Sequence, residues 1–130
     1  MTSEAASRLG DLVEIVRGVT YKSMLLEEPG PHLLGLASIY PHGGFRSEKL
    51  KTYGGESKDK HICKEGDVYA SLKDVTQTAD LLGAVARIPP GFIGRLSQDT
   101  VRLNPKSTDV DMNYIYWILR TPQYRKEYSK

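Results

Sequence analysis

The sequence predicts an α+β fold: a twisted, mainly antiparallel sheet of short strands, with a short N-terminal helical turn and C-terminal helices. Three observations support this class. Apolar segments of strand length recur between turn residues, as in a meandering sheet. Between residues 68 and 72, the apolar Val68, Ala70 and Leu72 alternate with the hydroxyl-bearing Tyr69 and Ser71, which is the period of a half-buried strand. Apolar residues between 112 and 119 recur at helical spacing.

Length and composition predict one domain covering residues 1–130, with a single modest core. The 39% hydrophobic and 26% charged shares are ordinary for a soluble globular protein. No apolar run approaches the roughly 20 residues that a membrane helix needs. The N-terminus lacks the pattern of a signal peptide, and the single Cys63 excludes an internal disulfide. We therefore expect a cytoplasmic protein without membrane contact.

Basic side chains are unevenly distributed, although the net charge is only +2. Residues 41–65 contain six basic and four acidic side chains. Residues 112–130 contain four basic side chains and one acidic side chain. Residues 1–30 contain three basic and five acidic side chains. A solvated face explains so mild an asymmetry, so charge alone does not indicate a nucleic-acid partner.

The N-terminal segment 9–20 predicts a helical turn that enters a strand, and Gly18 ends or bulges that strand. Gly18 is expected where the backbone tolerates no side chain. Thr20 and Lys22 follow it and can bind a phosphate, but Thr20 can equally be a turn hydroxyl, and the structural interpretation is favoured at this position. The apolar run 32–40 predicts a strand buried on both faces.

Residues 41–60 form the longest segment without periodicity, with a short helix possible at 47–52. Loops of this length are usually functional or disordered. Cations and aromatic residues alternate between two Gly-Gly pairs of this loop: Phe45, Arg46, Lys49, Lys51 and Tyr53. Either a binding arm or a plain surface excursion fits this composition.

The segment 66–88 predicts a hairpin. Gly66 and Asp67 open it as a turn, in which the Asp67 side chain bonds to the backbone. Between the two strands, residues 73–78 offer side chains that donate and accept hydrogen bonds. Such a loop suits the recognition of a polar surface better than bond-breaking chemistry.

After the hairpin, the pattern predicts a turn at 89–91, short strands at 92–96 and 100–105, and two helices. The first helix, 109–120, has acidic residues first and Arg120 last, in agreement with the helix dipole. Pro122 opens the second helix, 122–128. The apolar face of the first helix is expected to consist of Met112, Ile115, Ile118 and Leu119. Its aromatic residues Tyr116 and Trp117 are expected in a core or an interface.

Several short segments in a fixed order give the chain a family resemblance, although none is diagnostic alone. They are Leu9-Gly10-Asp11, Gly18-Val19-Thr20, Gly66-Asp67, Ser71 to Thr78, Leu82 to Ala86, Leu96-Ser97-Gln98 and Asn104-Pro105. Over nearly its whole length the chain resembles the target recognition domain of Type I restriction-modification specificity subunits. Members of that family read DNA sequence for a separate methyltransferase and a separate translocase-nuclease.

The resemblance implies a sequence reader of double-stranded DNA whose partners are methyltransferase and restriction subunits. It also implies that the loop 41–60 lies beside DNA. Lysines and arginines would contact phosphates, Gln77 and the threonines would reach base edges, and Arg46 or Arg95 would contact guanine. The candidate DNA-binding residues are Arg46, Lys49, Lys51, Tyr53, Lys58, Lys73, Thr76, Gln77, Thr78 and Arg95.

A complete specificity subunit carries two such domains joined by long spacer helices. This sequence ends at Lys130 before any spacer. We therefore expect one recognition domain without spacer helices or a second domain, either excised or naturally truncated.

No catalytic, cofactor or metal motif is present. No Gly-rich loop follows a strand, and no acid–base constellation is recognisable. His61 and Cys63 share a strand face but lack the further ligands that a metal site needs. We therefore expect no enzyme, no cofactor and no bound metal. The alternative is a protein-interaction or assembly module that docks a partner through the Tyr116–Trp117 helix and the C-terminal tail.

Overall fold

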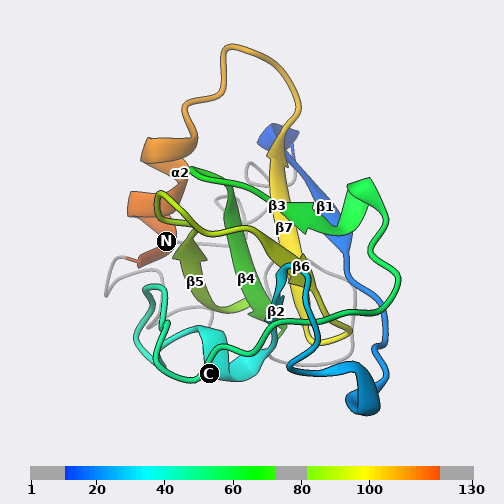
Figure 1. The fold of residues 1–130 in the computed structure, drawn as a ribbon. Helices are drawn as coiled ribbons and strands as arrows, with labels where there is room; N and C mark the ends of the chain where they lie inside the picture. Colours follow the sequence, from blue (N-terminus) through cyan, green and yellow to red (C-terminus); the bar gives the residue numbers. More distant parts are fainter. Residues whose placement is uncertain (1–10, 73–81, 121–130) are drawn as a thin grey trace.

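The computed structural model describes residues 11–72 and 82–120, and strands dominate these residues (Figure 1). The strands are β1 (Val13–Arg17), β2 (His32–Leu34), β3 (Ile62–Cys63), β4 (Val68–Leu72), β5 (Leu82–Arg87), β6 (Gly94–Leu96) and β7 (Thr100–Pro105). The helical elements are the short 3₁₀ turns η1 (Ser23–Leu25), η2 (Leu36–Ser38) and η3 (Asp59–His61), and the helix α2 (Met112–Arg120).

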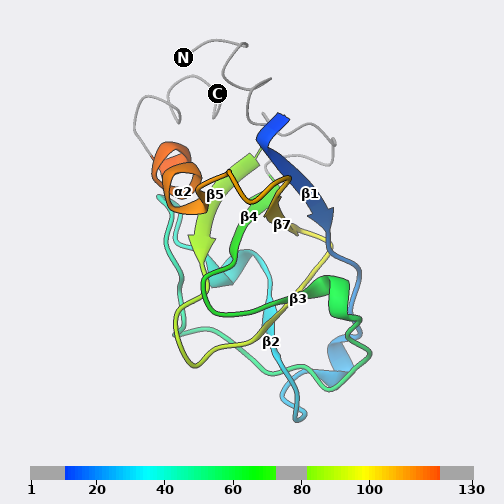
Figure 2. The ribbon, with the colours of Figure 1, turned by 90° about the horizontal axis from the view of Figure 1, so that it is seen from above.

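The strands form two sheets, which confirms the predicted α+β class with mainly antiparallel pairing. The four-stranded sheet has the order β1-β7-β4-β5 and is antiparallel throughout. The three-stranded sheet has the order β2-β6-β3, in which only the β2–β6 pair is parallel. The predicted hairpin is the β4–β5 pair, and helix α2 lies beside β5 (Figure 2).

Strand β4 separates two hydrophobic clusters. The first core cluster comprises Val13, Val68, Ala70, Val85, Val101, Leu103, Ile115 and Leu119. The second core cluster comprises Leu34, Ile39, Cys63, Tyr69, Ala86, Ile88 and Leu96. Because alternate residues of β4 enter different clusters, β4 is buried on both faces along Val68–Ala70. The prediction of a half-buried strand was therefore wrong.

Buried hydroxyl groups support the second core cluster. The Tyr69 hydroxyl lies 2.9 Å from Ser38 Oγ, and burial raises the pKa of this phenol. The Thr100 and Ser97 hydroxyls both donate to the carbonyl oxygen of Leu34, at 2.8 and 3.1 Å. These bonds attach the end of β2 to the start of β7.

The apolar run 32–40 is not one continuous strand. Only His32–Leu34 is extended, and the 3₁₀ turn η2 follows, with Leu36 56% exposed. The turn is stabilised by Ser38, whose Oγ donates to the carbonyl of Gly35 at 2.6 Å. Local hydrogen bonding of this kind competes with strand formation.

The loop 41–60 is attached to the body of the domain. Isolated bridges pair Ile39 with Phe45, His32 with Thr52, and Leu26 with Tyr53. The helix considered at 47–52 is absent from this described segment, where a turn brings the Leu50 N–H to the Ser47 carbonyl at 3.2 Å.

Two turn predictions are confirmed. A Cβ added at Gly18 would overlap the carbonyl group of Ser97, so this position tolerates no side chain. The Asp67 carboxylate accepts the Lys64 backbone N–H at 2.7 Å, which is the expected side-chain-to-backbone bond.

Helix α2 buries the predicted apolar face through Ile115 and Leu119. Trp117 is 69% exposed, so it does not belong to the core. The predicted helix 122–128 lies outside the described residues.

Candidate nucleic-acid interface

The long loop presents most of its predicted cations to solvent. Lys49, Lys51 and Lys58 are exposed, and none of these side chains forms an ion pair or hydrogen bond within the described residues. Arg46 differs, because its Nε lies 2.7 Å from Glu48 Oε1 and its guanidinium lies over the Tyr40 ring at 5.6 Å. The three lysines are therefore the freest candidates for contact with an anionic surface.

Lys49 and Lys51 share a depression of about 300 Å³ with Asp99. The backbone carbonyl of Asp99 accepts the N–H of Leu72, at 2.9 Å. Leu72 is the last described residue before position 73, so the fold brings the basic loop next to the base of the polar hairpin loop. The candidate residues of that loop lie outside the described residues: Lys73, Thr76, Gln77 and Thr78.

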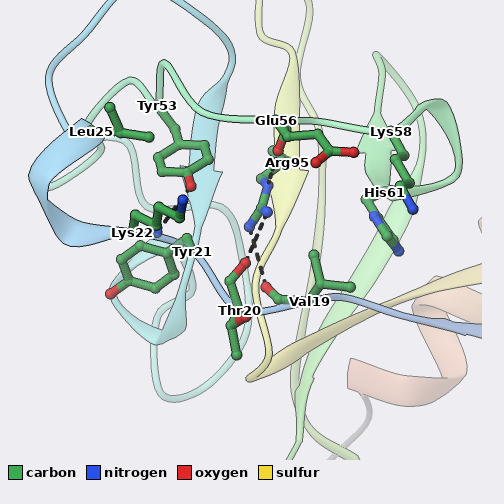
Figure 3. A pocket seen from close by; sticks show the side chains of 10 residues that line it. All are labelled: Val19, Thr20, Tyr21, Lys22, Leu25, Tyr53, Glu56, Lys58, His61 and Arg95. Carbon is green, nitrogen blue, oxygen red and sulfur yellow. Dashed lines mark hydrogen bonds between the residues drawn. The ribbon is translucent and has the colours of Figure 1, made fainter.

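Arg95 lies inside the molecule, 3% exposed on strand β6. Its guanidinium donates to four backbone carbonyls, those of Thr20 (2.9 Å), Val19 (3.2 Å), Leu96 (3.2 Å) and Glu56 (3.3 Å). The bonds to Thr20 and Val19 can be followed in Figure 3. A guanidinium held this way has no access to a guanine edge. The interpretation of Arg95 as a base-reading residue is therefore corrected to a structural role.

Tyr53 is also buried, at 3% exposure. Its ring lies under the Arg95 guanidinium at 4.7 Å and meets the Tyr21 ring edge-on at 6.0 Å. Its hydroxyl accepts the Lys22 backbone N–H at 2.9 Å. Tyr53 therefore holds the loop in place, and its ring is not available to stack on a base.

Arg95 and Tyr53 form part of the wall of a cavity of about 350 Å³ (Figure 3). Exposed Lys22 and Lys58 also line it, together with buried His61. Burial lowers the pKa of His61, and the nearby positive charges lower it further. The list of candidate DNA-binding residues omitted Lys22 and His61, although the sequence had indicated that Lys22 can bind a phosphate. The position of Lys22 just after Gly18-Val19-Thr20 was the available signal.

No catalytic or metal centre is evident in the described part of the chain. No group of three or more His, Cys, Asp or Glu residues is placed to hold a metal there. Burial raises the pKa of the Cys63 thiol to about 12, so it is a poor nucleophile at neutral pH. None of the described helices is long and apolar enough to span a membrane.

Comparison with known proteins gives a clear result for the fold. No family model matches the chain, and neither does any curated protein. The HsdS subunit from Thermoanaerobacter tengcongensis superimposes on 92% of this chain with a TM-score of 0.59 and 16% identity. The chain has the fold of part of an HsdS subunit.

A second match is a chain from a structural study of complex assembly and conformational transition of the type I R-M system. It also covers 92% of this chain, with a TM-score of 0.59 and 14% identity. The chain spans only 27% and 28% of the two matched chains. The likeness therefore concerns one segment of a much longer subunit.

Proposed function

We propose that this domain recognises a DNA sequence as the target recognition domain of a Type I specificity subunit. It directs partner methyltransferase and restriction subunits to the target site and is itself non-catalytic. The observation that carries the proposal is the HsdS fold across 92% of the chain. The ordered motifs from Leu9 to Pro105 support the same family independently.

In this proposal, one set of residues contacts phosphates and another reads bases. Lys49, Lys51 and Lys58 contact phosphates and set the position of the domain on the duplex. The hairpin loop contacts the bases. Gln77 pairs with the N6/N7 edge of adenine, and the methyl group of a threonine packs against the methyl group of thymine. Strands β4 and β5 precede and follow this loop in the sequence, and both contribute residues to the first core cluster.

The decisive experiment is selection of bound duplexes from a random pool, followed by binding measurements on the selected site. Gln77→Ala is expected to lose about 1–3 kcal/mol at one base pair and to relax the preference there. Lys51→Gln is expected to weaken binding to all duplexes alike. Asn113→Ala, an exposed amide on α2, is the matched control and should change neither. Failure to enrich any sequence would contradict the proposal.

A second candidate function is docking of a protein partner, favoured by two exposed aromatic residues on α2. Tyr114 is 59% and Trp117 69% exposed. A salt titration separates the two functions. DNA binding weakens steeply with salt because counterions are released, whereas an apolar docking surface responds little. Trp117→Ala would abolish partner docking and leave duplex selection intact.

A further inference from the structure

The cavity shown in Figure 3 lies where three separate parts of the chain meet. Residues 19–22, just after β1, form one side, residues 53–58 of the long loop form another, and Arg95 of β6 lies between them. Thr20, Lys22 and Lys58 are exposed, so the cavity is open to solvent. Its volume of about 350 Å³ lies in the range of small-ligand sites, about 300–1,000 Å³.

Positive charge predominates in the lining. Lys22, Lys58 and Arg95 contribute three cations, and Glu56 contributes the one carboxylate. Arg95 donates only to neutral backbone carbonyls, and no carboxylate lies within ion-pair distance of it in the described part of the chain. A buried charge without a counter-charge is unfavourable, so an anion that enters the cavity is stabilised.

Two further cations, Lys60 and Arg102, lie close enough to His61 to affect its pKa. After burial, the causes that lower its pKa are all cationic neighbours: Lys60, Arg95, Lys58 and Arg102. Figure 3 places His61 beside Lys58, on the opposite side of Arg95 from Lys22. Lys22 and Lys58 therefore flank Arg95 on two sides of the cavity, with the Glu56 carboxylate on the Lys58 side.

The free polar groups of the lining are those that bind oxyanions. Within the described residues, the ammonium groups of Lys22 and Lys58 and the hydroxyl of Thr20 have no hydrogen-bond partner. Ammonium groups only donate, and a hydroxyl can donate, so together they match the several acceptor oxygens of a phosphate.

We propose that this cavity is a phosphate-binding site, formed by Lys22, Lys58 and Thr20 around Arg95, which holds a backbone phosphodiester of the bound duplex. The DNA part of this inference rests on the proposed DNA-reading function. Arg95 acts as a positioning residue, because it fixes the carbonyls of Val19 and Thr20 and supplies a fixed positive charge. The site sets position and carries no base preference.

The first test uses inorganic phosphate and amide NMR, at an ionic strength matched with sodium chloride. Saturable shifts are expected at the amides of residues 20–22 and 58–61. They should disappear in the double variant Lys22→Gln/Lys58→Gln. Lys106→Gln is the control for loss of charge. The Lys106 N–H bonds to the Leu12 carbonyl at 2.9 Å, at the opposite end of β1 from the cavity. Thermal melting checks that each variant folds.

The second test measures duplex affinity against salt. The double variant is expected to reduce the slope of log K against log salt by about 1 for each lost phosphate contact, for selected and random duplexes alike. Phosphate shifts with an unchanged DNA slope would assign the site to free phosphate and overturn its DNA occupant. Absence of both effects overturns the site altogether.

The two proposals can fail separately. A domain that selects duplexes but shows neither effect retains the proposed function without this site. A domain that binds phosphate at these residues but no duplex retains the site without the proposed function.

Discussion

The two core clusters on either side of β4 are built differently. The first core cluster consists of aliphatic side chains from four strands and α2. The second core cluster lies next to the buried polar residues Ser38, Ser97 and Thr100, and the buried Arg95 lies at its edge. The first therefore depends on apolar burial, whereas the second also depends on hydrogen bonds to irregular backbone.

The difference follows from what each cluster supports. Regular strands and helices satisfy their own carbonyl groups, so aliphatic packing is sufficient beside them. Segments 19–22, 35–38 and 53–58 lie outside the two sheets, and carbonyls in each of them accept hydrogen bonds from side chains. Buried polar residues are thus concentrated where the chain leaves regular structure, and the candidate phosphate site lies there.

Replacement of Arg95 should have the largest effect on stability. Arg95→Met keeps much of the side-chain volume but leaves the carbonyls of Val19, Thr20 and Glu56 without this donor. We expect a loss of about 3 to 5 kcal/mol in the free energy of unfolding, measured with urea. A loss below about 1 kcal/mol would show that the second core cluster and the segments beside it do not depend on their side-chain hydrogen bonds.

Truncation in the first core cluster should have a somewhat smaller effect. Leu103→Ala removes a side chain that is 2% exposed and should reduce the free energy of unfolding by about 3 kcal/mol. Leu36→Ala is the matched control, since Leu36 is largely exposed, and should change stability by less than about 0.5 kcal/mol. Equal losses in the two variants would contradict the assignment of this core.

Removal of one hydroxyl tests the polar network more finely. Tyr69→Phe keeps the ring in the second core cluster but removes the bond to Ser38 Oγ. We expect a loss of about 1 to 2 kcal/mol. Tyr114→Phe, on an exposed ring of α2, should be neutral in the same urea titration. A neutral Tyr69→Phe would mean that packing alone supports this cluster.

The smallest expected effect is a pH dependence through His61. Burial and nearby cations lower its pKa from the ordinary value of 6.5. Just below pH 6.5 the unfolded chain therefore binds a proton more readily than the folded one, and stability falls as the pH is lowered through this range. His61→Asn should flatten this slope. An imidazole NMR titration with a midpoint above 6.5 would contradict the environment described for His61.

The sequence predicted best those elements whose cause is local. The β4–β5 hairpin, the turn at Asp67 and the buried face of α2 were all predictable from periodicity and turn chemistry. The run 32–40 was misinterpreted because apolar composition did not reveal that Ser38 would close a turn onto Gly35.

The site was harder to predict than the fold. Arg95 and Tyr53 are residue types typical of a DNA-binding surface, but both are buried through contacts with residues 31 to 76 positions away. No local pattern encodes such contacts. Lys49, Lys51 and Lys58 are exposed, as contact with phosphates would require, whereas the contribution of Lys22 to a cavity could be found only from the three-dimensional arrangement.

The pairing of β1 with β7 has a consequence for biosynthesis. Val13 pairs with Pro105, about ninety residues later in the chain. At ribosomal rates of about 5–20 residues per second, β1 waits roughly 5 to 20 s before its partner is made. During that interval its hydrogen-bonding edge is open to other chains, which is a hazard for aggregation. Slower translation before position 100 should therefore lower the yield of folded domain, and co-expressed chaperones should restore it.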